Sequence, residues 1–146
     1  MNGLLSYDFL NSTAIVIGNS VYNDNSLVDL PTVENNTNGM ITVLSDIKII
    51  GFHDNKIHKF FNYNSASELG KELASIILNT SDTLLLYYAG HGKLNDEGEL
   101  FLTVSGTDIK ALELTSLPFK AIKNLLSKSP AIRKILIIDS CFSGRA

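Results

Sequence analysis

The sequence predicts an α/β fold in which a mostly parallel sheet is flanked by helices. Four short apolar runs stand out, at residues 14–17, 57–61, 83–89 and 135–138. Three of them are continuous rather than alternating, which is typical of strands covered on both faces, as in a parallel sheet. Helical patterns lie between the runs, and such alternation is typical of strands joined by right-handed crossovers.

The first half of the chain contributes two strands and two helices to this scheme. After the strand at 14–17, residues 33–46 carry apolar side chains at helical spacing. The run 57–61 is the second strand. Ser65 or Ser67 can cap the helix that follows it, because a serine oxygen accepts a free N–H of the first turn.

The second half contributes the other two strands, a hairpin arm and a third helix. After the strand at 83–89, a turn at 95–98 precedes residues 99–104, which are expected to form a small hairpin arm. A third helix is expected to begin near Ser116, with Pro118 in its first turn, where a missing N–H costs little. The last apolar run is the fourth principal strand.

Composition limits the classes of function. The 146 residues fit one domain, residues 1–146, and 45% of them are hydrophobic. With a net charge of −3 and no basic run, nucleic acid is not expected as a direct partner. No apolar run approaches the roughly 18 residues that cross a bilayer, and no secretion signal is recognisable, so we expect a cytoplasmic protein without a membrane partner.

Reactive side chains follow the third and fourth strands. The third strand runs into Gly90-His91-Gly92, and the fourth runs into Asp139-Ser140-Cys141. Each signal alone is weak, because Gly-His-Gly fits any tight turn and a single cysteine is most often a small buried hydrophobe. If the two strands are neighbours, however, both groups meet at the edge where α/β sheets bind ligands. We therefore expect a catalytic dyad, with Cys141 as nucleophile and His91 as acid and base.

The glycines beside the histidine have a use in the same chemistry. Gly90 and Gly92 are expected to let the chain turn sharply. The backbone N–H groups of Gly92 and Cys141 are candidates for an oxyanion hole, which needs donors about 3 Å from the developing charge. His53 and His58 are expected outside the site, the first solvated and the second packed or at a sheet edge. No metal site is expected, because the potential ligands are not clustered.

Several motifs resemble those of one protease clan. Tyr87-Tyr88-Ala89-Gly90-His91-Gly92 resembles the histidine motif of the caspase, metacaspase and paracaspase clan, and Asp139-Ser140-Cys141-Phe142-Ser143-Gly144 resembles its cysteine motif. The cysteine follows the histidine by about 50 residues, as in caspases. Ala14 to Tyr22 and Leu30-Pro31 resemble earlier segments. The Cys-Phe-Ser-Gly-Arg-Ala ending is most similar to prokaryotic members. The resemblance implies a three-layer caspase-like (caspase-hemoglobinase) fold and a cysteine endopeptidase, of which this chain is the large catalytic subunit.

The resemblance also implies a substrate preference. In metacaspase-like members an Asp two residues before the nucleophile lines the primary specificity pocket, and Asp139 is the matching residue. A buried carboxylate there favours Arg or Lys before the scissile bond; the alternative is that Asp139 caps a turn. Where the family often has Asn-Asp after Leu-Pro, this chain has Asn35-Asn36. Glu34 or Asp29 would have to supply the missing carboxylate.

Partners are implied in the same way. The chain is expected to lack the strands of a small catalytic subunit, which a separate subunit or the remaining C-terminal chain would supply, with a cut or processing site near Arg145-Ala146. A protein or peptide substrate and a regulatory partner domain or protein are expected, in a regulated effector of prokaryotic defence, stress or cell death. No cofactor is expected. Calcium activation occurs in some metacaspases, but residues 95–97 look like a solvated turn.

Two other interpretations were open from the residues. One is a catalytically silent caspase-like module with a regulatory or assembly role, against which the intact dyad argues. The other is a receiver-like or nucleotide-binding α/β domain. The first strand is followed by Gly18-Asn19-Ser20, which is not a phosphate-binding glycine pattern, and no acidic cluster follows a strand.

Overall fold

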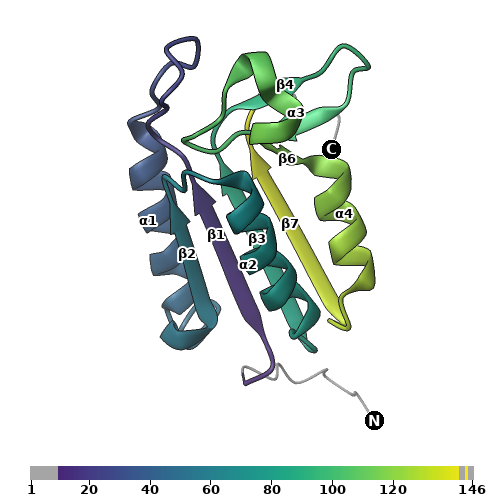
Figure 1. Cartoon of the computed structure of the whole chain (residues 1–146). Coiled ribbons are helices and arrows are strands. Elements are labelled where there is room, and N and C mark those ends of the chain that lie inside the picture. The colour runs from purple at the N-terminus through teal and green to yellow at the C-terminus, as the bar shows by residue number, and fades with distance from the viewer. Residues whose placement is uncertain (1–9, 142–143, 145–146) are drawn as a thin grey trace.

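The principal sheet has four parallel strands. The structure is a computed structural model that describes residues 10–141 and residue 144. In it the strands β1 (Thr13–Gly18), β2 (Ile57–Phe61), β3 (Thr83–Ala89) and β7 (Arg133–Asp139) lie in the order β2-β1-β3-β7 (Figure 1). All three pairings are parallel. The predicted α/β class and the four predicted strands are confirmed.

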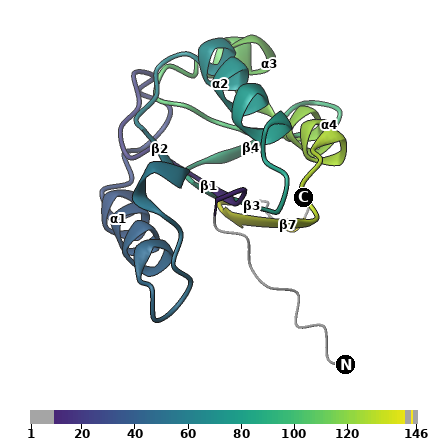
Figure 2. The ribbon, with the colours of Figure 1, turned by 90° about the horizontal axis from the view of Figure 1, so that it is seen from below.

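Helices cover both faces of this sheet. The view in Figure 2 shows α1 (Thr32–Ser45) on one face, with α2 (Ala66–Leu78) and α4 (Phe119–Lys128) on the other. One apolar core lies between the sheet and α2 and α4, and a second lies under α1. Strands β1 and β3 are buried along their whole length because both faces are covered. This is why their sequences are continuously apolar.

The helix starts follow local chemistry. Of the two serines proposed as a cap for α2, Ser65 has this role, since its Oγ accepts the N–H of Glu68 at 3.2 Å. The prediction that the third helix begins near Ser116 was wrong. Leu117 and Pro118 have instead joined a second sheet, and Pro118 is extended, with ψ at 122°, so α4 begins at Phe119.

That second sheet is small and antiparallel. It contains β4 (Gly92–Leu94), β5 (Leu100–Leu102) and β6 (Leu117–Pro118), in the order β4-β5-β6. Strands β4 and β5 form the predicted hairpin. The short elements η2 (Ile109–Ala111) and α3 (Leu112–Thr115) follow β5, and η1 (Asp54–Lys56) precedes β2. The small sheet lies at the carboxyl end of the principal sheet, directly beyond β3 and β7 (Figure 1).

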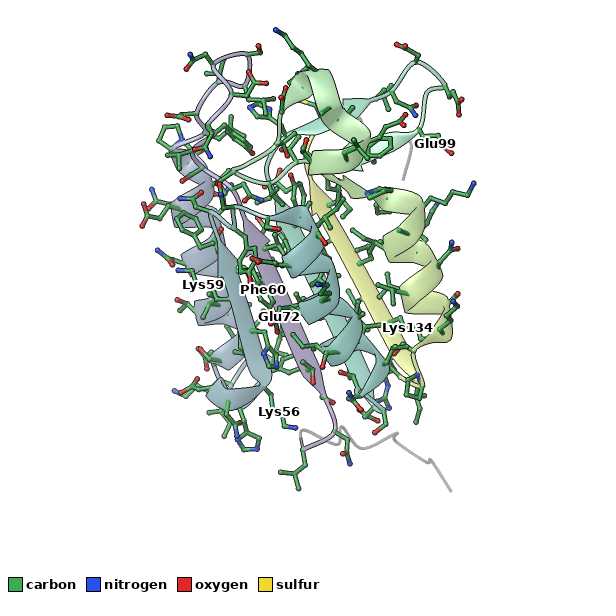
Figure 3. The ribbon with its side chains drawn as sticks, viewed as in Figure 1. Lys56, Lys59, Phe60, Glu72, Glu99 and Lys134 are labelled. Carbon is green, nitrogen blue, oxygen red and sulfur yellow. The ribbon has the colours of Figure 1, made fainter. Side chains whose placement is uncertain are left out.

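The two edges of the principal sheet differ. Lys59 lies on the outer strand β2, where its ammonium binds Asn38 at 2.9 Å and covers the ring of Phe61 (Figure 3). Charged side chains of this kind discourage further strand pairing. At the opposite edge, Ile135 and Ile137 of β7 are 40% and 37% exposed. An open cavity of about 190 Å³ lies beside them, lined by Ile49, Ile50, Phe52, Thr83, Leu85 and Ile135.

Among the residues that the structure describes, no helix is both long and apolar enough to cross a membrane. This agrees with the short apolar runs in the sequence.

Gly18 offers a test of the packing between β1 and α1. A Cβ at this position would meet the Thr37 hydroxyl, the Phe61 ring and the Val33 side chain. We expect Gly18→Ala to lower the free energy of unfolding by about 1–3 kcal/mol, because overpacking forces backbone or rotamer shifts. Urea unfolding measures the effect.

The matched control is the same substitution at Gly70 in α2, where an added Cβ has nothing within 4 Å. Alanine is the better helix former, so Gly70→Ala should raise the free energy of unfolding by about 0.5–1 kcal/mol. If Gly18→Ala were as stable as the unaltered protein or more stable, the packing argument for Gly18 would be wrong.

Candidate active site

The pairing of β3 with β7 places the predicted dyad. Ala89 lies opposite Asp139, and the Gly90 N–H donates to the Asp139 carbonyl oxygen at 3.3 Å. His91 and Cys141 each follow this last pair by two residues. The imidazole is half-buried and Cys141 is exposed. The predicted neighbouring strands are therefore confirmed, and the two groups leave adjacent strands at the same end of the sheet.

Gly90 and Gly92 permit close packing where the chain leaves β3. The chain bends at Gly90, as expected, but neither glycine has a positive φ, unlike Gly51 and Gly98, so the bend itself does not require glycine. A Cβ at Gly92 would instead collide with the carbonyl oxygen of Cys141, and a Cβ at Gly90 would collide with the Tyr88 hydroxyl. The absence of a side chain at Gly92 lets the histidine segment lie directly against the cysteine segment, and its absence at Gly90 leaves room for the hydroxyls of Tyr88 and Tyr22.

The backbone of Gly92 is oriented by the hairpin. The Thr103 N–H donates to the His91 carbonyl oxygen at 3.1 Å, and the Asn95 N–H donates to the Glu99 carbonyl oxygen at 3.1 Å. Hydrogen bonds alternate along an antiparallel strand, so residues 91, 93 and 95 bond toward β5. The N–H of Gly92 consequently points away from β5. Gly92 itself is buried against Cys141, and its oxyanion role stays a prediction.

The imidazole of His91 is held by a backbone carbonyl. Its Nε2 lies 2.7 Å from the carbonyl oxygen of Val28, in the loop between β1 and α1. A carbonyl oxygen only accepts hydrogen bonds, so Nε2 carries the proton and Nδ1 of the neutral ring is left as the acceptor. The sequence could not indicate this partner, because a main-chain oxygen leaves no residue-type signal.

The carbonyl oxygen of His91 is fixed by buried groups. Tyr88 Oη lies 2.8 Å from it and 2.8 Å from the Thr103 carbonyl oxygen. The Thr103 hydroxyl donates to the same His91 oxygen at 3.0 Å. Burial raises the pKa of Tyr88 well above its ordinary value, so this hydroxyl stays protonated as a donor. Within the histidine motif, Tyr88 thus fixes the backbone of His91.

Asp139 lies beside Asn36 and Tyr87 at the end of β7. Its Oδ2 accepts the Tyr87 hydroxyl at 3.3 Å and the Asn36 amide at 3.4 Å. The carboxylate is exposed rather than buried as expected, because β7 is an edge strand. Burial, and next the negative charge of Asp139, raise the pKa of Tyr87 to about 12.

Asn36 stands at the position where the family often has an Asp. This position is next to Asp139, but here its side chain is an amide rather than a second carboxylate. Of the two carboxylates proposed as substitutes, Asp29 is engaged elsewhere, accepting the N–H of Tyr22 at 3.0 Å. Glu34 is exposed in the first turn of α1. Asp139 is the carboxylate that the structure places at this end of β7.

The other two histidines lie away from the dyad. His53 is exposed before η1, and His58 is half-buried at the start of the edge strand β2, as expected. Burial lowers the pKa of His58. Within residues 10–141 and 144, no group of three or more His, Cys, Asp or Glu side chains could hold a metal ion.

Comparison with known proteins decides the family. The model of the caspase domain matches residues 11–146, nearly the whole chain. The chain belongs to the caspase family. Solved structures share its fold at low identity. Caspase-1 from Spodoptera frugiperda has a TM-score of 0.63 at 19% identity, over 90% of this chain, and pro-sf-caspase-1 has a TM-score of 0.65 at 19% identity, over 92%.

A bacterial protein has the same fold. Protein GSU0716 from Geobacter sulfurreducens has a TM-score of 0.66 at 16% identity, over 89% of this chain. The matched regions are 50%, 48% and 52% of the bacterial protein, caspase-1 and pro-sf-caspase-1, so this chain spans about half the length of each. No curated protein matches the sequence.

The contact between Tyr87 and Asp139 can be tested by titration. A phenolate beside a carboxylate is disfavoured, so Asp139→Asn should lower the Tyr87 pKa from about 12 toward its ordinary value. Because burial is the larger cause, the pKa should stay above about 10. Tyrosine ¹³Cζ shifts followed against pH give both values. An unchanged Tyr87 pKa in the variant would show that the two groups are not in contact.

Proposed function

We propose that this caspase-family domain is the catalytic portion of a cysteine endopeptidase that cleaves after Arg or Lys. The observation that carries the proposal is the β3–β7 pairing, which brings His91 and Cys141 to one end of the sheet. The Val28 carbonyl supports it by leaving Nδ1 of His91 as the basic nitrogen. The caspase-domain match supports the same chemistry.

The reaction follows from these groups. His91 Nδ1 takes the proton of the Cys141 thiol, and the thiolate attacks the scissile carbonyl carbon. The backbone N–H groups of Gly92 and Cys141 bind the oxygen that becomes negative. The imidazolium returns its proton to the leaving amine as the C–N bond breaks, which leaves a thioester on Cys141. Water, deprotonated by His91, hydrolyses the thioester and regenerates the thiol.

The preference for a basic residue rests on Asp139. Its two side-chain partners, Tyr87 and Asn36, are neutral donors, so neither of them pairs the carboxylate with a positive charge. A guanidinium or ammonium group before the scissile bond would pair with the carboxylate, and arginine would do so with two parallel hydrogen bonds. Asp139 ends β7 two residues before Cys141, which is the spacing that the family resemblance associates with the specificity pocket.

Peptide cleavage tests the dyad and the preference together. With the full-length protein, fluorogenic peptides with Arg or Lys before the cleaved bond should be hydrolysed, and peptides with Asp should not. Cys141→Ala and His91→Ala should abolish cleavage. Asp139→Ala should lower kcat/KM for Arg peptides by about tenfold or more, the effect of a lost charged hydrogen bond.

Asp96→Ala, in the exposed hairpin turn, is the matched control and should leave kcat/KM unchanged. Assays with and without calcium test whether that ion activates the protein. Cleavage only after Asp would reject the basic preference and leave the dyad standing. A properly folded full-length protein that cleaves no peptide, and whose biological effect survives Cys141→Ala, would favour the catalytically silent module.

We also propose that a further segment, equivalent to the rest of the relatives' chains, docks on β7. Three features of the described residues support it. The β7 edge has no neighbouring strand, Ile135 and Ile137 are exposed, and the cavity beside Ile135 is apolar. Because this chain spans about half of the matched structures, a segment of suitable length exists in those relatives. It would add strands to the edge and cover the face beside α1.

Covering this edge should change stability and activity. We expect residues 1–146 alone to be aggregation-prone and poorly active, because an exposed apolar edge strand recruits other chains. Adding the remaining chain, in cis or as a separate subunit, should raise the melting temperature and peptide cleavage. Differential scanning fluorimetry and the peptide assay measure both. Equal activity and stability of the isolated domain would contradict the proposal.

A further inference from the structure

We propose that Tyr22 is a positioning residue that fixes the orientation of His91, an inference that rests on the proposed function. Tyr22 lies in the loop between β1 and α1, far from the histidine in sequence. It contacts both the backbone and the ring of His91. In the sequence Tyr22 ends the family-like segment that begins at Ala14, but nothing there indicated a contact with His91.

The first contact is with the backbone. The His91 N–H donates to Tyr22 Oη at 3.1 Å, and Tyr22 Oη donates to the Asn19 carbonyl oxygen at 3.0 Å. Asn19 in turn is fixed to β3, because its N–H donates to the Ala89 carbonyl oxygen at 3.0 Å. The phenol therefore links the histidine segment to the end of β1 through one oxygen atom. Without it the His91 N–H would have to find another acceptor.

The second contact is with the ring. The centroids of the Tyr22 and His91 rings are 5.0 Å apart, with an interplanar angle of 44°. On the same loop, the Val28 carbonyl binds His91 Nε2. Asp29 Oδ1 accepts the Tyr22 N–H at 3.0 Å and so ties the two parts of the loop together. One loop thus holds His91 at three points. These are its main-chain N–H, the face of its imidazole ring and its Nε2 atom.

The loop is itself fixed to the rest of the domain. Asn62, with a φ of 50°, accepts the Ser20 N–H through its side chain at 2.7 Å. The Asn23 N–H donates to the Ser105 carbonyl oxygen at 2.9 Å. Asp24 Oδ2 accepts the Ile109 N–H at 2.8 Å. Because the loop is anchored at three places, it can hold His91 in a defined position.

The protonation state suits this role. Burial raises the pKa of Tyr22, so the phenol keeps its proton at neutral pH. A neutral hydroxyl donates one hydrogen bond and accepts others at the same time, which the contacts with Asn19 and His91 require. Phenylalanine would keep the ring contact and lose both hydrogen bonds, whereas leucine would lose all of them.

The test distinguishes an effect on the orientation of His91 from an effect on substrate binding. In the full-length protein, Tyr22→Phe should lower kcat for an Arg peptide by about tenfold, the worth of a hydrogen bond of this kind, with KM unchanged. Tyr22→Leu should lower kcat further. Tyr63→Phe removes the same atom from a half-buried tyrosine whose ring packs on Phe60, and it should change neither constant.

A second measurement follows the reactivity of Cys141 without substrate. The rate at which iodoacetamide alkylates Cys141, quantified on its peptide by mass spectrometry between pH 5 and 9, reports thiolate formation (about 8.5 is the ordinary thiol pKa). His91→Ala should change this profile. Tyr22→Phe should shift it partly toward that of His91→Ala, and Tyr63→Phe should leave it as in the unaltered protein.

The outcomes distinguish the inference from the proposed function. If His91→Ala changes alkylation and cleavage but Tyr22→Phe and Tyr22→Leu do not, Tyr22 has no positioning role and the dyad stands. If Tyr22→Phe lowers only the melting temperature or raises only KM, its role is structural and the inference is also wrong. If His91→Ala leaves the alkylation profile and cleavage unchanged, the proposed function itself fails.

Discussion

The parallel pairing of β3 with β7 is the constraint on which the candidate site depends. Its register places Ala89 opposite Asp139, and every later residue of the two segments inherits that alignment. His91 and Cys141 therefore leave the sheet at the same end because main-chain hydrogen bonds align the two strands. The contact between Gly92 and the Cys141 carbonyl follows from the same alignment. The two segments can lie this close only because residue 92 has no side chain.

The fold was predictable because its strands are buried on both faces. Residues 83–89 are continuously apolar since helices cover both sides of β3, and that pattern predicted the strand correctly. It did not predict the strand order, so the adjacency of β3 and β7 was only a condition until the structure showed it. The boundary of α4 was not predictable, because Leu117 and Pro118 pair with β5, a long-range contact that overrides the local preference of proline for a first helical turn. The prediction that Asp139 is buried was wrong for a similar reason. Whether β7 is an edge strand depends on the strand order, which is set by long-range pairing.

Side-chain chemistry predicted the reactive groups, but their supports are mainly backbone atoms. The sequence predicted His91 and Cys141 as the dyad because few other residue types fit that chemistry. It missed Val28, whose carbonyl rather than side chain binds the imidazole, and Tyr22, whose contact spans 69 residues of sequence. A carbonyl oxygen is a suitable partner for Nε2, since it selects the tautomer of the ring without adding a second negative group to the site. Any residue type can provide it, which is why composition gives no sign of it.

The exposure of Asp139 connects specificity with the open edge of the sheet. A carboxylate in water attracts a cation only weakly, because solvent screens the charge, whereas the same pair is several times stronger when water is excluded. Tyr87 and Asn36 bind the carboxylate, and within residues 10–141 and 144 no strand pairs with the outer edge of β7. A segment that pairs with β7 would therefore cover Ile135 and Ile137 and also enclose Asp139. Stability of the sheet and recognition of a basic residue would then depend on the same added chain, and the selectivity for Arg or Lys would rise in parallel with the melting temperature as that segment docks.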